Sequence, residues 1–338
     1  MDTRVLPAGK EEIMEAGKLL SSGEIVAIPT ETVYGLAANA FDGKAVAKVF
    51  EAKGRPQDNP LIVHVSDISQ VEKLVSVFPE KAKILAQRFW PGPLTMIMPK
   101  SELIPDEVTC GLDTVAIRFP SHKTAQKIID AAGVPLAAPS ANRSGSPSPT
   151  SAKHVFNDMD TRIPLIIDDG ECEVGVESTV VTLAKEPPEL LRPGAVTLEM
   201  LREAIGEINV SQAVLSKLAE GERPASPGMK YKHYAPKAEV TIVEGGIEKF
   251  AQYVKNNAQS GDYVMCFEGE ERYFDIPCVT FGTQEDALSQ SHHLFDALRR
   301  TDELGAKRVF ARCPESAGVG LAVLNRLLRA AAFRVVRL

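Results

Sequence analysis

A segment bounded by proline and glycine divides this sequence into two parts of unequal length. Residues 221–236 read GERPASPGMKYKHYAP, and proline and glycine at the two ends are typical of a linker. The middle of the segment carries Tyr231, His233 and Tyr234 beside lysines, which is too aromatic and too basic for a passive tether. We therefore interpret residues 207–236 as a linker that also forms a lid over a neighbouring ligand site; the alternative is a docked connector that only covers apolar surface.

The part before the linker, residues 1–206, has the pattern of an α/β domain. Apolar residues recur at helical spacing in 11–21 and 43–53, and apolar runs at 24–28 and 61–65 suit buried strands. Further strand candidates lie at 94–98, 114–119, 135–138, 165–167 and 178–183, and further helical patterns at 69–77, 80–90, 122–132 and 197–205. Strands and helices alternate without a strict βαβ order, so we expect a mixed, twisted sheet.

The part after the linker, residues 237–338, shows a second and smaller α/β pattern. Strand-like and helix-like runs alternate along it, at 240–243, 247–257, 263–266, 284–304, 308–310, 321–332 and 334–336. This alternation predicts a small, doubly wound, Rossmann-like domain.

Composition excludes several classes of protein. With 338 residues, 44% of them hydrophobic and 25% charged, the chain can bury a core in each of two domains. The formal net charge of −7 disfavours nucleic acid as the main ligand, although it leaves room for a local basic cleft. No run reaches the 18 apolar residues of a membrane span, and the amino terminus lacks a hydrophobic signal core.

The cysteines and histidines indicate neither disulfides nor a metal site. The five cysteines are scattered without a CxxC pair, and the six histidines form no HExxH or HxxxH pattern. Scattered thiols are typical of a reducing compartment. We therefore expect a cytoplasmic protein with no membrane association and no protein-held metal.

Two short runs in the first part indicate a phosphate site. Lys53 and Arg55 flank Gly54 where a helix should end, and residues 139–145 read PSANRSG after an apolar strand. Two cations in a constrained loop suit phosphate binding, although one of them would also complement the helix dipole. Ser140 and Asn142 offer short donors there, whereas the alternative is a flexible serine-rich loop.

Three other polar residues sit where the pattern is apolar. Thr32 follows the first buried strand, where it either contacts a ligand or caps a turn. His64 lies inside a strand, and the simpler interpretation is a core histidine with one neighbour. Arg118 also lies inside a strand, so it needs an anionic partner, either a substrate carboxylate or a structural acid.

Common nucleotide and hydrolase templates are absent. The sequence has no GxxxxGK[ST] loop and no GxSxG elbow. The run 318–323 has valine where the third glycine of GxGxxG would stand, so a dinucleotide site is not indicated.

The combined motifs resemble the YrdC-type family, the threonylcarbamoyl-adenylate synthases of tRNA modification. The motifs are PTETVYGL at 29–36, KGRP with NPL at 53–61, FWPGPLT at 89–95, AIRFP at 116–120, PSANRSG at 139–145, GVEST at 175–179 and LLRPG at 190–194. The linker and the terminal run GLAVLNRLLRAA at 320–331 are similar to the long, two-domain form. The resemblance implies a YrdC-like twisted mixed-sheet domain with a large concave cavity.

The resemblance also implies a reaction and its site. L-Threonine, bicarbonate and ATP would form L-threonylcarbamoyl-AMP and pyrophosphate, for later modification of tRNA beside the anticodon. The implied threonine pocket comprises Thr32, His64, Arg118, Ala138 and Ser178. The implied ATP site comprises Lys53, Arg55, Asn59, Thr114, Ser140, Asn142, Ser148, Arg192, Tyr231, His233 and Tyr234. The catalytic residues among these would be Lys53, Arg55, Ser140 and Asn142.

The same resemblance suggests cofactors, partners and rival functions. Mg²⁺ would arrive on the phosphates of ATP, because no carboxylate cluster suggests a dedicated cage. A downstream threonylcarbamoyl-transfer complex would use the product, and tRNA is a further candidate partner. The alternatives are an RNA-binding module of the same fold and a carbamoyl-adenylate former of the hydrogenase-maturation type.

Overall fold

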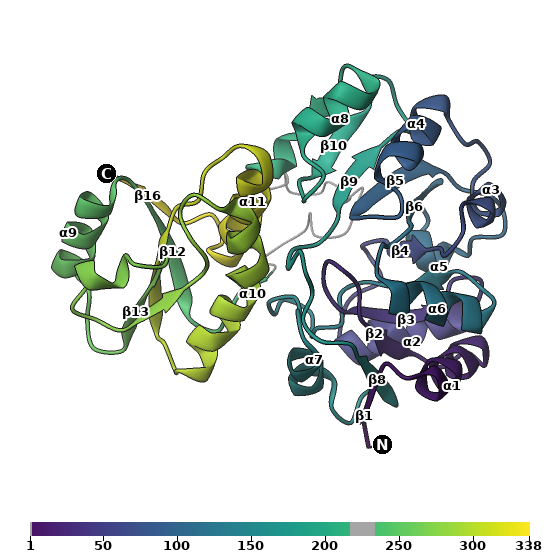
Figure 1. Cartoon of the computed structure of the whole chain (residues 1–338), viewed down its shortest axis with the longest axis horizontal. Coiled ribbons are helices and arrows are strands. Elements are labelled where there is room, and N and C mark those ends of the chain that lie inside the picture. The colour runs from purple at the N-terminus through teal and green to yellow at the C-terminus, as the bar shows by residue number, and fades with distance from the viewer. Residues whose placement is uncertain (1, 217–233) are drawn as a thin grey trace.

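The computed structural model describes residues 2–216 and 234–338, which form two α/β units (Figure 1). The strands of the first unit are β1 Arg4–Pro7, β2 Val26–Ile28, β3 Gly35–Asn39, β4 Ile62–His64, β5 Leu94–Pro99, β6 Thr114–Arg118, β7 Leu136–Ala137, β8 Leu165–Asp168, β9 Thr179–Thr182, β10 Glu189–Arg192 and β11 Asn209–Val210. Its α-helices are α1 Lys10–Ser21, α2 Gly43–Lys53, α3 Val71–Leu74, α4 Glu80–Phe89, α5 Asp106–Thr109, α6 Lys123–Ala132, α7 Ala152–Met159 and α8 Leu198–Ile205.

The first unit is built on one mixed, eleven-stranded sheet. Its strand order is β1-β8-β2-β3-β7-β4-β6-β5-β9-β10-β11. Parallel pairs such as β4 with β6 alternate with antiparallel pairs such as β5 with β6. The register of β4 and β6 sets His64 opposite Arg118, so two residues that lie far apart in the sequence become neighbours.

Helix α2 shows how local sequence positions the site. The carboxylate of Asp42 accepts hydrogen bonds from the backbone amides of Lys44 and Ala45 and so caps the start of the helix. Gly54 follows the last helical residue with φ +61°, the left-handed conformation that glycine adopts without strain. The turn confirms the helix end predicted from the KGRP motif and directs Lys53 and Arg55 toward the loop after β7.

The second unit carries a parallel, five-stranded sheet in the order β14-β13-β15-β12-β16. Its strands are β12 Glu239–Glu244, β13 Asp262–Cys266, β14 Cys278–Thr280, β15 Arg308–Arg312 and β16 Val335–Arg337. Its helices are α9 Ile247–Asn257, α10 Ala287–Glu303 and α11 Gly318–Ala330. Figure 1 shows α10 and α11 on the face toward the first unit and α9 on the far side, which is the expected two-sided cover of a Rossmann-like sheet.

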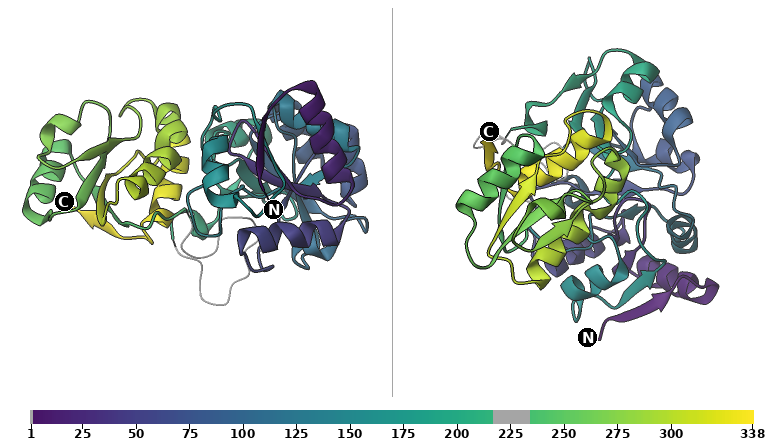
Figure 2. Two further views of the ribbon diagram at one scale, coloured as in Figure 1. Left: turned by 90° about the horizontal axis from the view of Figure 1, so that it is seen from below. Right: turned by 60° about the vertical axis from the view of Figure 1, so that its left-hand side comes forward.

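The two units share a hydrophobic core. Val33 and Val176 of the first unit pack in one cluster with Phe295 on α10 and with residues of α11. Tyr234 belongs to the same cluster, and its ring lies 5.2 Å from that of Phe295. The left view of Figure 2, like Figure 1, has the yellow-green and yellow helices of the second unit on the side of the first unit, while the C-terminus lies on the outer side.

Most sequence-based elements are confirmed, and the misses are short or small-residue segments. The helix predicted at 69–77 is wrong over most of its length, because a 3₁₀ turn at Ile68–Gln70 leads into only four residues of α3. Strands β1, β3, β11 and β14 and helices α5 and α7 were not predicted. The expected boundary at residue 206 stays a prediction, although β11 extends the first sheet to Val210.

All five cysteines are free thiols. Within residues 2–216 and 234–338, no helix has both the length and the apolar character that a membrane span requires.

One close helix contact in the first unit generates a stability test. An alanine methyl at Gly17 on α1 would lie 2.6 Å from the carbonyl carbon and from Cβ of Ala131 on α6. We expect Gly17→Ala to lower the free energy of unfolding by about 1–3 kcal/mol despite its better helix propensity, because the two helices must move apart. Urea denaturation measures this. The exposed Lys18→Ala on the same helix is the control, and equal stability of both variants contradicts the close packing.

Candidate functional site

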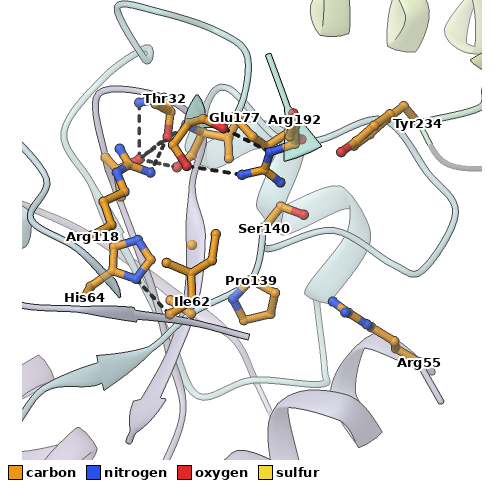
Figure 3. Close-up of a pocket in the computed structure, with 15 residues that line it drawn as sticks. Thr32, Arg55, Ile62, His64, Arg118, Pro139, Ser140, Glu177, Arg192 and Tyr234 are labelled. Atoms are coloured by element: carbon orange, nitrogen blue, oxygen red, sulfur yellow. Dashed lines mark hydrogen bonds between the residues drawn. The ribbon is translucent and has the colours of Figure 1, made fainter. Parts of the chain in front are cut away.

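A cavity of about 540 Å³ of empty space, part of it open to solvent, lies in the first unit where β4, β6 and the loop after β7 meet (Figure 3). It is lined by Thr30, Thr32, Val33, Gly35, Arg55, Ile62, His64, Arg118, Ala138, Pro139, Ser140, Glu177, Ser178, Arg192 and Tyr234. The lining contains all five residues of the expected threonine pocket. Of the expected ATP residues, it contains Arg55, Ser140, Arg192 and Tyr234.

Arg118 stands at the end of β6 with a structural acid beside it. Its Nη2 lies 2.7 Å from Oε2 of Glu31, and both side chains are only 4% exposed. Its Nη1 donates a hydrogen bond of 2.8 Å to the hydroxyl of Thr32. Burial alone would raise the pKa of Glu31, but the charge of Arg118, together with the hydrogen bond from the backbone amide of Ser121, holds that pKa below its usual value.

The guanidinium of Arg118 retains hydrogen-bonding capacity. Its Nε and Nη2 are buried, and neither donates a hydrogen bond to any described residue. The contact of Nη2 with Glu31 is close enough for an ion pair, but its orientation is poor for a hydrogen bond. Buried donors of this kind are costly unless a partner arrives, and a planar carboxylate is the partner that a guanidinium fits best.

His64 lies beside Arg118 as a neutral ring. Its side chain is buried, and Nδ1 lies 3.1 Å from the carbonyl oxygen of Ile62 (Figure 3). Because a carbonyl only accepts, we assign the ring hydrogen to Nδ1. Burial, together with the nearby charge of Arg118, lowers the pKa of His64 to about 3. The imidazole ring therefore contributes a polar but uncharged surface to the cavity.

A second polar wall is formed by the segments around Ser178 and Arg192. Arg192 donates from Nε to the carbonyl of Ser178 at 2.9 Å and from Nη2 to its hydroxyl at 3.1 Å. The same hydroxyl lies 2.7 Å from that of Thr95 on β5. Burial lowers the pKa of Arg192 to about 10, so the residue keeps its charge at neutral pH. Ser178 is thus fixed between two strands with its hydroxyl at the cavity.

Glu177 is a buried carboxylate in this wall with all its oxygens engaged. One oxygen accepts from the hydroxyl of Ser148 and the other from Nε of Arg326, which belongs to α11 of the second unit, at 2.9 Å. Burial would raise the pKa of Glu177, but Arg326, Arg192 and Ser148 together hold it below its usual value. The carboxylate is therefore ionised at neutral pH.

The PSANRSG loop is organised by Lys53. Its ammonium donates to the carbonyl oxygens of Ser140 at 2.5 Å and of Asn142 at 2.6 Å. Asn142 in turn accepts from the hydroxyl of Ser140 and donates to the carbonyl of Ser146. Lys53 is only 4% exposed, and burial lowers its pKa well below the usual value. It thus holds the loop from behind, and Ser140 reaches the cavity.

Arg55 and Tyr234 close the side of the cavity opposite Arg118 and His64 (Figure 3). Nη2 of Arg55 donates to the carbonyl of Asn59 at 2.6 Å, and its guanidinium lies over the ring of Phe50. Tyr234 adopts φ +63° and is 4% exposed. The side with Arg55 is thus cationic and aromatic.

Several expected ATP residues lie outside the cavity lining. Asn59, Asn142 and Ser148 are buried behind it, and Thr114 starts β6 at the end opposite Arg118. Strand rise puts these two ends of β6 about 13 Å apart. Tyr231 and His233 fall outside the described residues. The roles of these residues in binding ATP stay predictions.

Sequence reasoning missed the two buried acids, Glu31 and Glu177. Glu31 lies in the PTETVYGL motif next to Thr32, and the need of Arg118 for an anion was the signal that could have identified it. Glu177 lies in GVEST before Ser178, and its partner Arg326 comes from the terminal GLAVLNRLLRAA run. No local pattern connects those two motifs.

The donor set of the described residues suits anions better than a metal ion. No group of three or more His, Cys, Asp or Glu side chains among them could hold a metal. Arg55, Arg118 and Arg192 all line the cavity, so its charge is dominated by cations. The arrangement can bind a carboxylate at one end and phosphates at the other.

Comparison with known proteins places these features in a family. The profile named Sua5/YciO/YrdC, described as telomere recombination, matches residues 18–194. A second profile, the threonylcarbamoyl-AMP synthase C-terminal domain, matches residues 196–332.

Full-length relatives agree with both profiles. The threonylcarbamoyl-AMP synthase of Pyrococcus abyssi is 46% identical over 330 residues, which is 96% of each chain. That of Bacillus subtilis is 47% identical over 339 residues, covering 99% of this chain and 97% of the relative. A crystal structure of P. abyssi Sua5 complexed with L-threonine superposes with a TM-score of 0.92 at 44% identity and covers all of both chains.

Because the profiles cover both α/β units and the relatives align from end to end, the chain belongs to the Sua5/YciO/YrdC family, in the form that carries the threonylcarbamoyl-AMP synthase C-terminal domain.

Proposed function

We propose that this protein is an L-threonylcarbamoyl-adenylate synthase that consumes L-threonine, bicarbonate and ATP. The proposal is carried by one observation, a single cavity whose Arg118 end is fitted to a carboxylate and whose Arg55 end is fitted to phosphates. Family membership supports it, because full-length relatives have the name threonylcarbamoyl-AMP synthase.

The chemistry needs alignment and charge neutralisation more than a protein nucleophile. The threonine amine takes up CO₂ from bicarbonate and becomes an N-carboxylate. One oxygen of this group attacks the α-phosphorus of ATP, the bond from that phosphorus to the bridging oxygen breaks, and pyrophosphate leaves. Fixed cations and hydroxyls stabilise such a transfer when they hold both reactants in line.

We assign the Arg118 end of the cavity to threonine. The two unused donors of Arg118 would take the α-carboxylate of threonine, and Thr32 and Ser178 present hydroxyls nearby. His64 would orient the substrate and not act as the base, because a pKa of about 3 makes it a poor proton acceptor at neutral pH. Ala138 would contribute its backbone.

We assign the Arg55 end to ATP. Arg55 and Arg192 would neutralise phosphate charge, Ser140 would donate to a phosphate oxygen, and Tyr234 would contact the nucleotide. Lys53 and Asn142 would act mainly by holding Ser140 in place, since their polar groups are engaged within the loop. Mg²⁺ would enter bound to the triphosphate and lower its negative charge.

The wider setting follows from the product. A mixed anhydride such as threonylcarbamoyl-AMP is reactive, so a transfer complex that modifies tRNA would take it up. The five free thiols suit the cytoplasm. To make a carbamoyl-adenylate, the hydrogenase-maturation alternative would need a carbamoyl donor, for example carbamoyl phosphate, in place of threonine. An RNA-binding module would need no ATP.

The reaction itself gives the first functional prediction. Pyrophosphate release from ATP should require both L-threonine and bicarbonate. A coupled pyrophosphate assay with each component omitted in turn measures this, with carbamoyl phosphate as a further arm. Release that is independent of threonine, or supported by carbamoyl phosphate alone, would reject the proposal.

The two ends of the cavity should respond separately to matched substitutions. Arg118→Lys keeps the charge beside Glu31 but loses the planar fork, so the KM for threonine should rise about tenfold with little change for ATP. Arg55→Lys should do the reverse. Steady-state kinetics with each substrate varied compares them, and a rise in the KM for ATP in both variants contradicts the assignment.

The buried neutral His64 should make stability depend on pH. The unfolded chain takes up a proton below the usual pKa of 6.5, whereas folded His64 stays neutral down to about pH 3. The free energy of unfolding should therefore fall as the pH is lowered, by about 2 kcal/mol between pH 7 and 5 from this residue alone. In urea denaturation, the His64→Gln variant should not show this decrease. A substitution of the exposed His293, His293→Gln, should still show it. Equal pH dependence in both variants would disprove the burial effect.

A further inference from the structure

The second unit reaches the site through one face of α11. Arg326 on this helix is fully buried at 0% exposure, although it is the largest of the fully buried side chains. Its guanidinium makes three contacts with the first unit: Nε with the carboxylate of Glu177 at 2.9 Å, Nη2 with the carbonyl of Glu177 at 3.0 Å, and Nη1 with the carbonyl of Pro193 at 2.6 Å. Figure 1 shows α11 on the side of the second unit that faces the first.

The neighbours of Arg326 on α11 serve the adjacent segment. Asn325 donates to the carbonyl of Val214 at 2.6 Å, and Arg329 donates to that of Ala213 at 2.8 Å. Buried carbonyls need donors, and here a helix of the other unit supplies them. The helix therefore completes the hydrogen bonding of three first-unit segments at once, near residues 177, 193 and 213.

The segment near residue 177 is part of the cavity wall, and the segment near residue 193 packs against it. Glu177 and Ser178 line the cavity, and Gly194 packs so closely on Thr179 that an added methyl would lie 2.4 Å from the Thr179 amide nitrogen. Any shift of Glu177 is thus passed to Ser178 and to the strand that follows. The loop that ends at Gly194 cannot move without also moving β9, which begins at Thr179.

Glu177 also connects Arg326 to the nucleotide side. Its second oxygen accepts from Ser148, and the charge of Arg192 acts on the same carboxylate. Without Arg326, the carboxylate of Glu177, which is only 6% exposed, would keep only part of the interactions that stabilise its charge, and such a group protonates or moves. Either outcome disrupts the hydrogen bond between Ser148 and Glu177 and changes the electrostatic environment of Arg192.

We propose that Arg326 of the second unit is a positioning residue for the synthase reaction. It holds Glu177 and thereby positions Ser148 and Arg192 for the nucleotide and Ser178 for threonine. It touches no substrate itself. This role gives the terminal GLAVLNRLLRAA run a function in catalysis beyond packing. The inference rests on the proposed function for its kinetic test, and on the fold alone for its structural test.

The chain offers a matched control. Arg312 on β15 is also a buried arginine that pairs with a buried glutamate, Glu270, and donates to a carbonyl, that of Gly245. All of these partners lie in the second unit. Arg312→Met therefore removes the same chemistry without touching the first unit, and any general loss of stability appears in both variants.

The kinetic test compares Arg326→Met, Arg326→Lys and Arg312→Met in the full chain. We expect Arg326→Met to raise the KM for ATP about tenfold, with a smaller change for threonine, because two of the groups tied to Glu177 lie on the nucleotide side. Arg312→Met should leave both KM values within about twofold of the wild type. An unchanged KM for ATP in Arg326→Met, or an equal rise in Arg312→Met, overturns the proposal.

The pH profile separates positioning from mere packing. In Arg326→Met the pKa of Glu177 should rise, so that Glu177 is partly protonated at low pH. The activity of this variant, divided by that of the wild type, should therefore increase as the pH is raised from about 5.5 to 8. Arg326→Lys keeps a positive charge beside Glu177, so its activity relative to the wild type should not change with pH. Its KM for ATP should stay raised, because the contacts with the carbonyls of Glu177 and Pro193 are lost. If the activity of Arg326→Met relative to the wild type does not change with pH, the charge of Arg326 has no role in positioning Glu177.

Hydrogen exchange tests the inference independently of activity. The amide of Thr179 donates to the carbonyl of Pro93, and we expect residues 175–180 to exchange faster in Arg326→Met but not in Arg312→Met. If the wild type makes no threonine-dependent pyrophosphate, the proposed function fails, yet this measurement still decides the positioning role. Equal protection of the segment in both variants rejects it.

Discussion

The buried charge of Glu177 is the constraint on which this molecule depends. A carboxylate removed from water must be compensated, and here the compensation comes from both α/β units: Arg326 from the second, and Ser148 and Arg192 from the first. Because each partner is itself fixed by further hydrogen bonds, the position of one carboxylate determines how the units meet and how the cavity wall is shaped.

The wall around Arg118 applies the same physics in another way. Arg118 is also compensated by a buried acid, Glu31, but its Nε and Nη2 remain without hydrogen bonds. Around Glu177 both carboxylate oxygens accept hydrogen bonds, so this wall is held in place. Around Arg118 some donors have no acceptor, so this wall can bind a ligand. A site that aligns two anionic reactants needs both kinds of wall, one that holds its shape and one that gains from binding.

The sequence predicted the architecture and many of the cavity residues, but not their partners. Periodicity located α2 and most strands because each has a clear apolar face, while β3 consists of small residues and β14 has only three. The strand position of Arg118 predicted an anionic partner without telling a substrate from Glu31. The contact of Glu177 with Arg326 spans 149 positions, and it depends on how two units dock, which no local pattern records.

The shared core also has an evolutionary consequence. Val33 and Val176 of the first unit pack with Phe295 and its neighbours, so a change in side-chain volume on α10 moves segments that border the substrates. Selection on a single activity therefore acts also on positions of α10 that lie outside the cavity lining. The packing between the two units therefore limits which substitutions either of them can accept.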